Sequence, residues 1–382
     1  MKILLYGIGK ELVNVESRIK EQHEIIGYMD SYAKIKIYRE KPFFELKSIK
    51  NISFDYLVIT VSDRRAAWNI QEMLINNYNV SHEKIVPFWV YVKRELWKIK
   101  MKKYDLGNIK GLIFGNSHAI CGYLEKELFL PFINLAVTSQ DLYYSYRVFH
   151  TCMEEYGTAL KNLEYVVVDL YDYIEFNIDL SLTSNCLDYI YNGGIQDEHN
   201  FKNNKNFCDS MEMELFKRYG IKIKEEKNRI MIDVFDDVDA EFDYVPDNRW
   251  KHIEQDVPLP ANQILGSSIT KRFEKTIEEN LNIIEEFIKE IKSKNPRMKI
   301  VFTLIPKYIS IEKAAESVMH VWKKEFYQIV TDLCDRYGIY FFDYKNCKCI
   351  SQNHMFYYDI GHLNTVGARA MTAILNEDLK QL

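Results

Sequence analysis

The stretch GLIFGNSH, residues 111–118, decides the fold expected for most of this chain. Its first four residues predict a short buried strand, and Gly115 and Asn116 predict a tight turn directly after it. Ser117 then stands where a following helix would begin. A serine on such a turn exposes its alcohol, which becomes a nucleophile only when a neighbouring base takes its proton. The alternative is an ordinary helix cap, for which serine is a common residue.

A second block, Asp359-Ile360-Gly361-His362, lies near the C-terminal end of the sequence. An Asp three residues before a His can hold the imidazole in one tautomer and support it when it becomes charged. His362 is therefore a candidate base for Ser117, with Asp359 as the group that orients it. Ser117 and this block flank one α/β alternation, which favours an active site over two unrelated turns.

The order Ser117, Asp359, His362, followed by His362-Leu363-Asn364-x-x-Gly367, resembles the SGNH (GDSL-like) hydrolases. The resemblance implies a three-layer α/β/α domain in which Ser117 is the nucleophile, His362 the base and Asp359 its orienting partner. It also implies an oxyanion hole formed by the backbone N–H of Ser117 and by one group from each of the next two motifs. Ser139 occupies the position of the usual glycine, and Tyr171 that of the usual asparagine. Asn116 replaces the usual aspartate beside the serine.

These departures leave several functions open. Divergent SGNH-like proteins linked to bacterial surface polysaccharides include esterases and O-acyl transferases, and this chain resembles them more than lipases. We therefore expect an enzyme that removes or transfers a carbohydrate O-acyl group, with an O-acylated carbohydrate or nucleotide-sugar as substrate. The alternative is a non-catalytic binding or scaffold protein of polysaccharide biosynthesis. A third option is acyl transfer with water excluded by an insertion.

The rest of the second domain is expected to alternate strands with helices. Such alternation predicts a parallel sheet with right-handed crossovers, so the predicted class is α/β. Apolar periodicity of three to four residues predicts a helix over residues 268–293, and another is expected over 311–336. The predicted strands are 112–114, 132–137, 165–170, 298–305 and 338–343. Residues 180–262 break the pattern, and we expect them to form an insertion, such as a lid over the catalytic edge.

The N-terminal part is expected to form a separate Rossmann-like parallel sheet, giving domains over residues 1–105 and 106–382. Its predicted strands are 2–6, 24–29, 56–61 and 84–88.

The first strand is followed by Gly7 and Gly9, and the second ends at Asp30, which is half of a dinucleotide fingerprint. Leu12 stands where the third glycine should be. The unit resembles the N-terminal Rossmann-like domains of bacterial sugar-biosynthesis enzymes, which implies a nucleotide or nucleotide-sugar ligand at Gly7, Gly9 and Asp30. A purely structural or dimerising role is the alternative.

Composition narrows the classes of partner. The net charge of −5 gives no basic footprint for nucleic acid. We expect no membrane span, since no window approaches about 20 apolar residues, and no secretory signal, which points to the cytoplasm. The 7 cysteines are scattered, and Cys347-x-Cys349 fits no usual zinc pattern, so no metal and no obligatory cofactor are expected. A homo-oligomer stays open. His118 is expected to be a solvent-facing loop residue.

Overall fold

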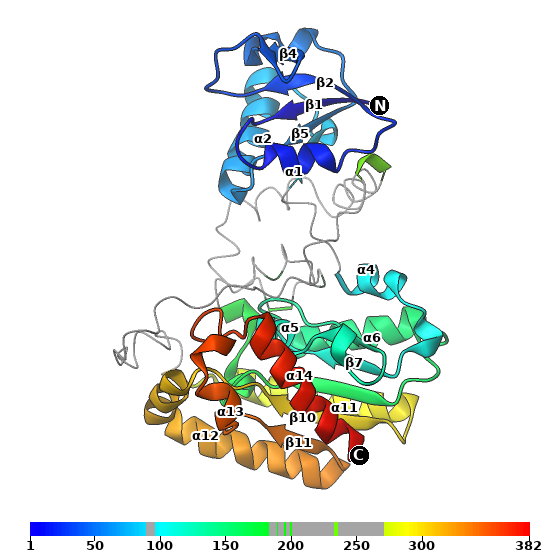
Figure 1. Ribbon diagram of the computed structural model, residues 1–382, viewed down its shortest axis with the longest axis vertical. Coiled ribbons are helices and arrows are strands. Elements are labelled where there is room, and N and C mark those ends of the chain that lie inside the picture. The colour runs from blue at the N-terminus through cyan, green and yellow to red at the C-terminus, as the bar shows by residue number, and fades with distance from the viewer. Residues whose placement is uncertain (89–95, 183–188, 190–194, 196–198, 201–232, 236–270) are drawn as a thin grey trace. The chain divides into compact units, whose positions relative to one another are not determined.

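The computed structural model describes residues 1–88, 96–182, 189, 195, 199–200, 233–235 and 271–382 (Figure 1). The chain divides into two compact units. The first comprises Met1–Arg94 with Lys202–Phe242, and the second comprises Glu95–Phe201 with Asp243–Leu382. Each unit contains helices and a largely parallel sheet, so the predicted α/β class is confirmed. Most of the insertion expected over residues 180–262, and with it the idea of a lid, lies outside the described residues.

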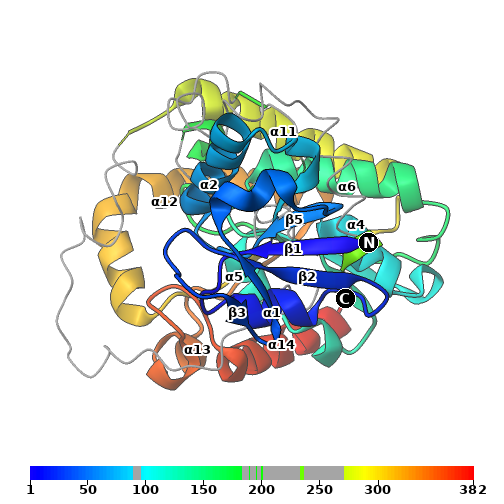
Figure 2. The ribbon, with the colours of Figure 1, turned by 90° about the horizontal axis from the view of Figure 1, so that it is seen from above.

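The first unit has a six-stranded sheet in the order β3-β4-β2-β1-β5-β6. Figure 2 shows β1 lying between β2 and β5. All strand pairs are parallel except β3–β4. The strands are β1 (Lys2–Tyr6), β2 (Glu24–Met29), β3 (Ile37–Tyr38), β4 (Lys41–Phe44), β5 (Tyr56–Ile59) and β6 (Ile85–Pro87).

The sequence pattern does not predict the β3–β4 hairpin. Its two linking residues, Arg39 and Glu40, have φ values of 47° and 64°. Two-residue hairpins favour turns with positive φ at both positions, where glycine, asparagine and aspartate are the usual residues. Because neither position carries such a residue, turn chemistry gave no signal for this hairpin.

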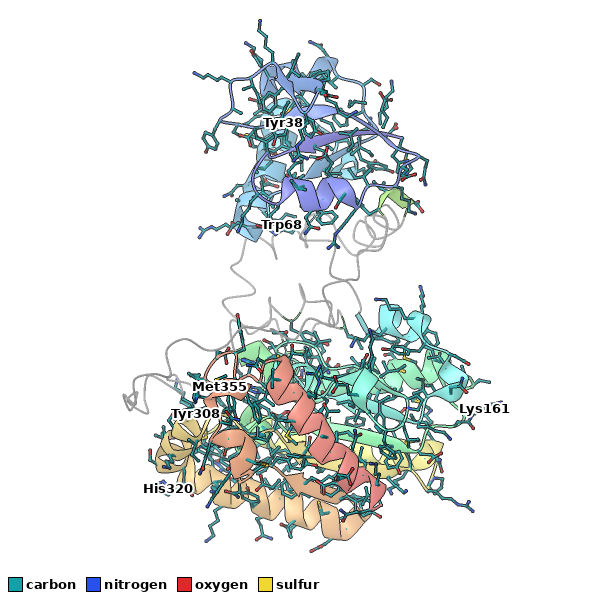
Figure 3. The ribbon with its side chains drawn as sticks, in the orientation of Figure 1. Tyr38, Trp68, Lys161, Tyr308, His320 and Met355 are labelled. Atoms are coloured by element: carbon teal, nitrogen blue, oxygen red, sulfur yellow. The ribbon has the colours of Figure 1, made fainter. Side chains whose placement is uncertain are left out.

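Two helices accompany this sheet. The longer one, α2 (Arg64–Tyr78), begins where Asp63 accepts a hydrogen bond from the backbone N–H of Ala66 at 2.7 Å. Trp68 on this helix is buried (Figure 3). The other elements are α1 (Leu12–Ser17) and the short 3₁₀ segments η1 (Leu46–Asn51) and η2 (His82–Lys84).

Residues 233–235 correct the predicted domain organisation, because they belong to the first unit although the sequence order suggested an insertion into the second. Phe235 pairs with Ile19 in a β-bridge, and its ring meets Phe88 at 4.9 Å between centroids. The carbonyl of Val234 accepts a hydrogen bond from Lys20 N–H at 3.0 Å. Val234 and Phe235 are nearly fully buried in the same apolar cluster as β1 and α1. The physical reason is simple: two adjacent large apolar residues need a core, and this unit supplies it.

The second unit has a five-stranded, fully parallel sheet in the order β11-β10-β9-β7-β8. The five strands occur where the sequence predicts them, most of them slightly shorter. Because all strands are parallel, their carboxyl ends share one edge, and the loops after β7, β8, β9 and β10 meet there. The strands are β7 (Gly111–Phe114), β8 (Phe132–Asn134), β9 (Tyr165–Asp169), β10 (Lys299–Leu304) and β11 (Tyr340–Asp343).

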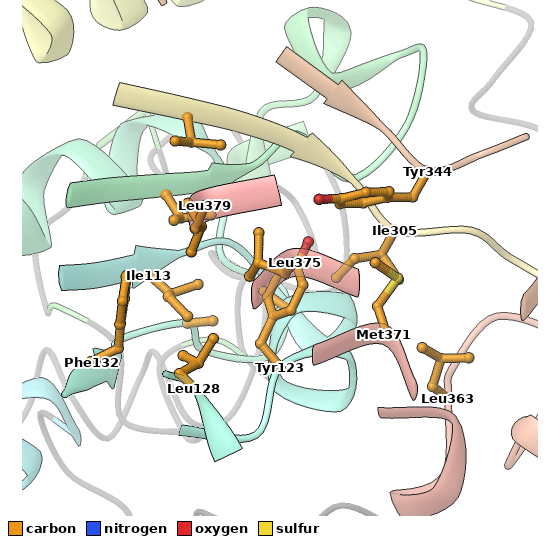
Figure 4. Packing of buried hydrophobic residues seen from close by; sticks show 14 of the residues in the cluster. Ile113, Tyr123, Leu128, Phe132, Ile305, Tyr344, Leu363, Met371, Leu375 and Leu379 are labelled. Carbon is orange, nitrogen blue, oxygen red and sulfur yellow. The ribbon is translucent and has the colours of Figure 1, made fainter. Parts of the chain in front are cut away.

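Helices cover both faces of this sheet. Ile113 on β7 packs in the cluster that contains Leu375 and Met371 of α14 (Figure 4). Its neighbour Phe114 points to the opposite face, where its ring meets Phe149 of α6 at 5.9 Å and Phe287 of α11 at 5.6 Å. Adjacent strand residues face opposite sides, so a continuous apolar run such as 111–114 requires a cover on each side.

The two helices predicted over residues 268–293 and 311–336 correspond to α11 and α12, and the largest difference is at the start of α11. The helix predicted from residue 268 begins at Glu274, and residues 268–270 lie outside the described part. The helices are α4 (Leu96–Lys103), α5 (Ser117–Gly122), α6 (Leu142–Tyr156), α11 (Glu274–Lys294), α12 (Ile309–Tyr337), α13 (Lys348–Ser351) and α14 (Thr365–Lys380). The 3₁₀ segments are η3 (Leu106–Asn108), η4 (Glu125–Glu127), η5 (Glu175–Asn177), η6 (Leu180–Leu182) and η9 (His354–Phe356).

Helix α4 moves the predicted boundary at residues 105/106 toward the N-terminus. Trp97 is 1% exposed and meets Tyr156 of α6 at 6.3 Å between ring centroids. Met101 packs against Cys152, with their sulfur atoms 3.8 Å apart. These contacts join α4 to the second unit, which therefore begins at Glu95. Among the described residues, no helix combines the length and apolarity that a bilayer crossing requires.

Candidate functional site

The turn after β7 places Ser117 at the first position of α5. Asn116 caps this helix, its side chain accepting a hydrogen bond from the backbone N–H of His118 at 3.0 Å. Gly115 has φ = 147°, and a Cβ there would lie 3.1 Å from the Cβ of Asp169 on β9. A residue with a side chain would therefore push the turn away from the neighbouring strand. The glycine and the asparagine each have a local backbone reason, whereas the residue that caps α5 is Asn116 and not Ser117.

The loop between η9 and α14 carries the second block. Asn364 fixes the end of this loop, because its side chain caps α14 by accepting from Val366 and Gly367 N–H, each at 3.0 Å. The same side chain donates to the carbonyl of Met355 at 2.8 Å. Asn364 is 1% exposed, so these bonds are made in the interior. The hydrogen bonds of Asn364 therefore anchor the loop that carries Asp359 and His362.

The structure brings the three predicted catalytic residues together. Ser117 Oγ lies 2.8 Å from His362 Nε2, although the two residues are 245 positions apart. On the other side of the ring, His362 Nδ1 lies 2.9 Å from Asp359 Oδ2 and 3.0 Å from Oδ1. The His362 and Asp359 side chains are 28% and 41% exposed, so the site is partly open to solvent.

These contacts decide the tautomer of neutral His362. An ionised carboxylate can only accept hydrogen bonds, so Nδ1 carries the proton that faces Asp359. Nε2 is then an acceptor and receives the hydroxyl proton of Ser117. Burial raises the pKa of Asp359, but the hydrogen bond and charge of His362 outweigh that effect and lower it below its ordinary value. Asp359 is thus ionised at neutral pH, as an orienting group must be.

Ser139 lies in the turn after β8. Its φ is 66°, the left-handed region where glycine is the usual residue. The next residue, Gln140, is 3% exposed, and its side-chain amide donates to the carbonyl of Gly115 at 3.1 Å. Val137 N–H donates to the same carbonyl at 3.3 Å. Gln140, which sequence reasoning missed, thus ties the Ser139 turn to the turn that carries Ser117.

Tyr171, the other predicted oxyanion-hole residue, also has positive φ, at 35°. Its ring centroid lies 5.0 Å from that of His118, with a tilt of 45°. Lys307 Nζ lies 4.6 Å from the centroid of the Tyr171 ring. The described contacts of this ring are therefore with His118 and Lys307.

His118 corrects a second expectation, since its side chain is 6% exposed and does not face solvent. Its ring stacks on His362 with centroids 4.5 Å apart and planes 14° apart. A Cβ on Gly361 would stand 3.3 Å from His118 Cε1, so the ring rests against that glycine. Burial, and then the charges of His362 and Lys307, lower the pKa of His118 well below its ordinary value. His118 is a neutral imidazole.

A buried ion network lies behind these rings. Asp172 is 1% exposed and pairs with Lys307, and its other oxygen lies 3.4 Å from Lys345 Nζ. Lys345 also contacts Glu312 at 3.0 Å. Although burial alone would raise the pKa of Asp172, the two ammonium groups lower it below its ordinary range. The network joins the loops after β9, β10 and β11 at the catalytic edge.

Asp169, the last residue of β9, is a further buried carboxyl. Its Oδ1 accepts from Thr303 Oγ1 and Ile305 N–H, each at 3.2 Å, while Oδ2 is buried without a hydrogen-bond partner. Burial raises the pKa of Asp169 to about 7, although the hydrogen bonds oppose the shift. The residue lies beside the turn of Gly115, where an added Cβ would stand 3.1 Å from the Asp169 Cβ.

The predicted nucleotide residues lie together in the first unit, Gly7 and Gly9 after β1 and Asp30 after the neighbouring strand β2. Gly7 has φ = 107°, and a Cβ there would lie 2.8 Å from Thr60 Oγ1. Gly9 has open space around its Cβ position, so its backbone does not require glycine. The Asp30 carboxylate accepts from Ile8 N–H at 3.2 Å and Tyr32 N–H at 2.9 Å, which shapes the loop itself. Nucleotide binding here stays a prediction.

Among the residues that the structure describes, no group of three or more histidine, cysteine or acidic side chains could hold a metal ion.

Comparison with known proteins adds little to this geometry. Residues 1–86 match the family model described as C2185-like, N-terminal. No curated protein matches the chain. A solved structure from Streptococcus pneumonia, described with the words "platelet activating factor", is 13% identical, with a TM-score of 0.33. That alignment covers 75% of this chain and 92% of the other. Such a likeness bears on neither fold nor activity.

Proposed function

We propose that this protein is a serine esterase or O-acyl transferase of the SGNH type that acts on a carbohydrate O-acyl group. The observation that supports the proposal is the continuous chain of contacts from Ser117 Oγ to His362 Nε2 at 2.8 Å and from His362 Nδ1 to Asp359 at 2.9 Å. A scaffold protein would not need Ser117 and His362 within hydrogen-bond distance. The alternative of a purely binding protein is therefore less well supported.

The proposed chemistry is acyl transfer through Ser117. Ser117 Oγ attacks the carbonyl carbon of the ester while His362 Nε2 takes the hydroxyl proton. The resulting imidazolium gives that proton to the leaving sugar oxygen, and an acyl-enzyme remains. Water or a second hydroxyl compound then attacks the acyl group with the same histidine as base, which regenerates Ser117. Asp359 keeps the ring oriented throughout.

The oxyanion needs donors close to Ser117. Its own backbone N–H is the first candidate, because the first amides of a helix have no partner within that helix. We propose the backbone N–H of Ser139 as the second, since its turn has the left-handed backbone expected of the glycine it replaces. Tyr171 is the third predicted donor, and its described ring contacts with His118 and Lys307 concern the ring rather than the hydroxyl. Loss of one donor costs roughly 10²–10³ in rate.

The substrate class rests on the sequence resemblance alone. We propose an O-acylated carbohydrate or nucleotide-sugar of bacterial surface-glycan metabolism, with the first unit presenting or sensing a nucleotide-linked sugar. Equilibrium dialysis of the full chain with radiolabelled UDP-sugars tests that part separately.

A fluorophosphonate probe tests the proposed reaction directly. It forms a covalent bond only with an activated serine, and peptide mass spectrometry locates the adduct. We expect labelling at Ser117, its loss in Ser117→Ala and its retention in the matched control Ser81→Ala, which removes an exposed serine of the first unit. Absence of labelling in the folded wild-type protein, when a known SGNH esterase reacts, contradicts the proposal. Comparing hydrolysis of 4-nitrophenyl acetate with and without a sugar acceptor then separates esterase from transferase.

A further inference from the structure

We propose that His118 is a positioning residue: the face of its imidazole holds the ring of His362 in plane and supports that ring when it becomes an imidazolium. The inference deepens the proposed function and rests on it for its catalytic meaning. The geometric part, one imidazole stacked on another, stands independently of any activity.

The first observation is the stack itself. The ring centroids of His118 and His362 are 4.5 Å apart and their planes differ by 14°. Ring face contacts of this kind restrict rotation of His362 about its side-chain bonds. Asp359 restrains the same ring through Nδ1 at its edge. Asp359 therefore limits movement of the His362 ring within its own plane, and His118 limits the tilt of that ring.

The second observation is the close fit around His118. Its Cε1 would lie 3.3 Å from a Cβ at position 361, so Gly361 leaves room for the ring to approach. The ring centroid of Tyr171 lies 5.0 Å from that of His118, and Lys307 Nζ lies 4.6 Å from the Tyr171 centroid. A column thus runs from Lys307 through Tyr171 and His118 to His362. These contacts restrict movement of the His118 ring.

The third observation is that a histidine at this buried position lowers the stability of the fold. Its Nδ1 is buried without a hydrogen-bond partner. An unsatisfied buried polar atom destabilises the folded state, and leucine or phenylalanine would fill the space without one. Because an apolar residue would fill this space with a smaller loss of stability, the presence of a histidine requires another explanation. An aromatic face against a ring that becomes cationic supplies one, because such faces attract cations.

The charges around the stack are consistent with this role. Burial contributes most to lowering the pKa of His118, the charges of His362, Lys307 and Lys345 act in the same direction, and the charge of Asp172 opposes them. A neutral His118 does not repel the imidazolium of His362, whereas a charged one would. His362 itself is faced by Ser117, His118 and the Asp359 carboxylate.

The test compares His118→Phe, which keeps an aromatic face, with His118→Leu, which has similar bulk and no such face. Protein labelled with ¹⁵N-histidine reports the titration of His362, assigned through His362→Gln. We expect the midpoint in His118→Phe to equal that of the wild type, and the midpoint in His118→Leu to fall by about half a pH unit. An unchanged midpoint in folded His118→Leu overturns the proposal. If that variant does not fold, His118→Gln replaces it.

The rate of fluorophosphonate labelling at Ser117 is the second readout. We expect a loss of about tenfold in His118→Leu and a change of less than about threefold in His118→Phe. Equal rates in the two variants contradict a positioning role, and so does a loss in both. If wild-type Ser117 does not react at all, the proposed function fails, while the titration of His362 still decides the inference.

Discussion

The Asp359 carboxylate contacts His362 in two places, at the ring and at the backbone. Its Oδ2 lies 2.9 Å from ring Nδ1, and its Oδ1 accepts the backbone N–H of the same residue at 2.8 Å. Oδ1 also accepts the N–H of Gly361 at 2.8 Å. One carboxylate therefore shapes the loop and orients the base, and a substitution can separate these two tasks.

Asp359→Asn should abolish most reactivity while leaving the loop in place. The amide oxygen can still accept the backbone N–H groups of Gly361 and His362, but its NH₂ facing the ring favours the wrong tautomer. We expect fluorophosphonate labelling of Ser117 to fall by about 10³-fold or more, with little change in melting temperature. Asp359→Ala is the matched control and should lower both the labelling of Ser117 and the melting temperature. Labelling of the Asn variant at the wild-type rate would remove Asp359 from the mechanism.

Ser139→Gly should stabilise the fold, because serine at φ = 66° occupies a conformation that glycine adopts without strain. We expect the free energy of unfolding to rise by about 0.5–1 kcal/mol, measured by urea denaturation. Ser139→Val is the opposite control, since a β-branched residue is still less suited to this backbone, and it should destabilise by roughly 1–3 kcal/mol. A destabilised Gly variant would show that the hydroxyl makes an essential contact.

Asp172→Ala should destabilise strongly. Removing this carboxylate leaves the ammonium groups of Lys307 and Lys345, 6% and 3% exposed, without their shared partner. Breaking a buried ion pair from one side costs about 3–5 kcal/mol. Thermal and urea unfolding measure the loss. The control Asp332→Ala removes an exposed carboxylate on α12 that contacts Gln328, and should cost less than about 0.5 kcal/mol.

Asp169→Asn should change how stability depends on pH. The folded pKa of Asp169 is raised to about 7, above the value of about 3.9 in an unfolded chain. The unfolded state therefore releases this proton first, so the contribution of Asp169 to stability is fully present below about pH 4 and is lost as the pH rises to about 7.

Replacing the Asp169 carboxyl should remove the loss of stability that accompanies the rise in pH. We expect Asp169→Asn to be more stable than the wild type at pH 8 by roughly 1–3 kcal/mol, with a smaller difference at pH 4. Urea denaturation of both proteins between pH 4 and pH 8 measures it. Parallel stability curves for the two proteins would show that Asp169 does not titrate in this range.

Phe235→Ala should destabilise the first unit. The ring is 3% exposed and packs against Phe88, and large-to-small changes at such positions cost about 3–5 kcal/mol. We expect a lower melting transition for the first unit and unchanged labelling of Ser117 in the second. Calorimetry with the probe assay measures both. The matched control is Phe129→Ala, because Phe129 is a phenylalanine that is 37% exposed. An undisturbed transition in Phe235→Ala would place residues 233–235 outside this core.

The sequence by itself determined the parts that depend on local pattern. Apolar runs and the turn residues after them located the strands of the second unit, because a strand buried on both faces must be apolar throughout. Local spacing was enough to pair Asp359 with His362, since the two residues are only three positions apart. The combination with Ser117 rested on family resemblance, and only folding brings that serine to 2.8 Å from His362.

The tertiary structure alone decided what depends on distant contacts. Nothing in the neighbours of His118 indicates that it is buried, because its partners Tyr171 and His362 come from other loops. Residues 233–235 likewise join the first unit through Ile19 and Phe88, more than a hundred positions away. Burial and pairing of this kind follow from which surfaces meet in three dimensions, and a linear pattern does not contain that information.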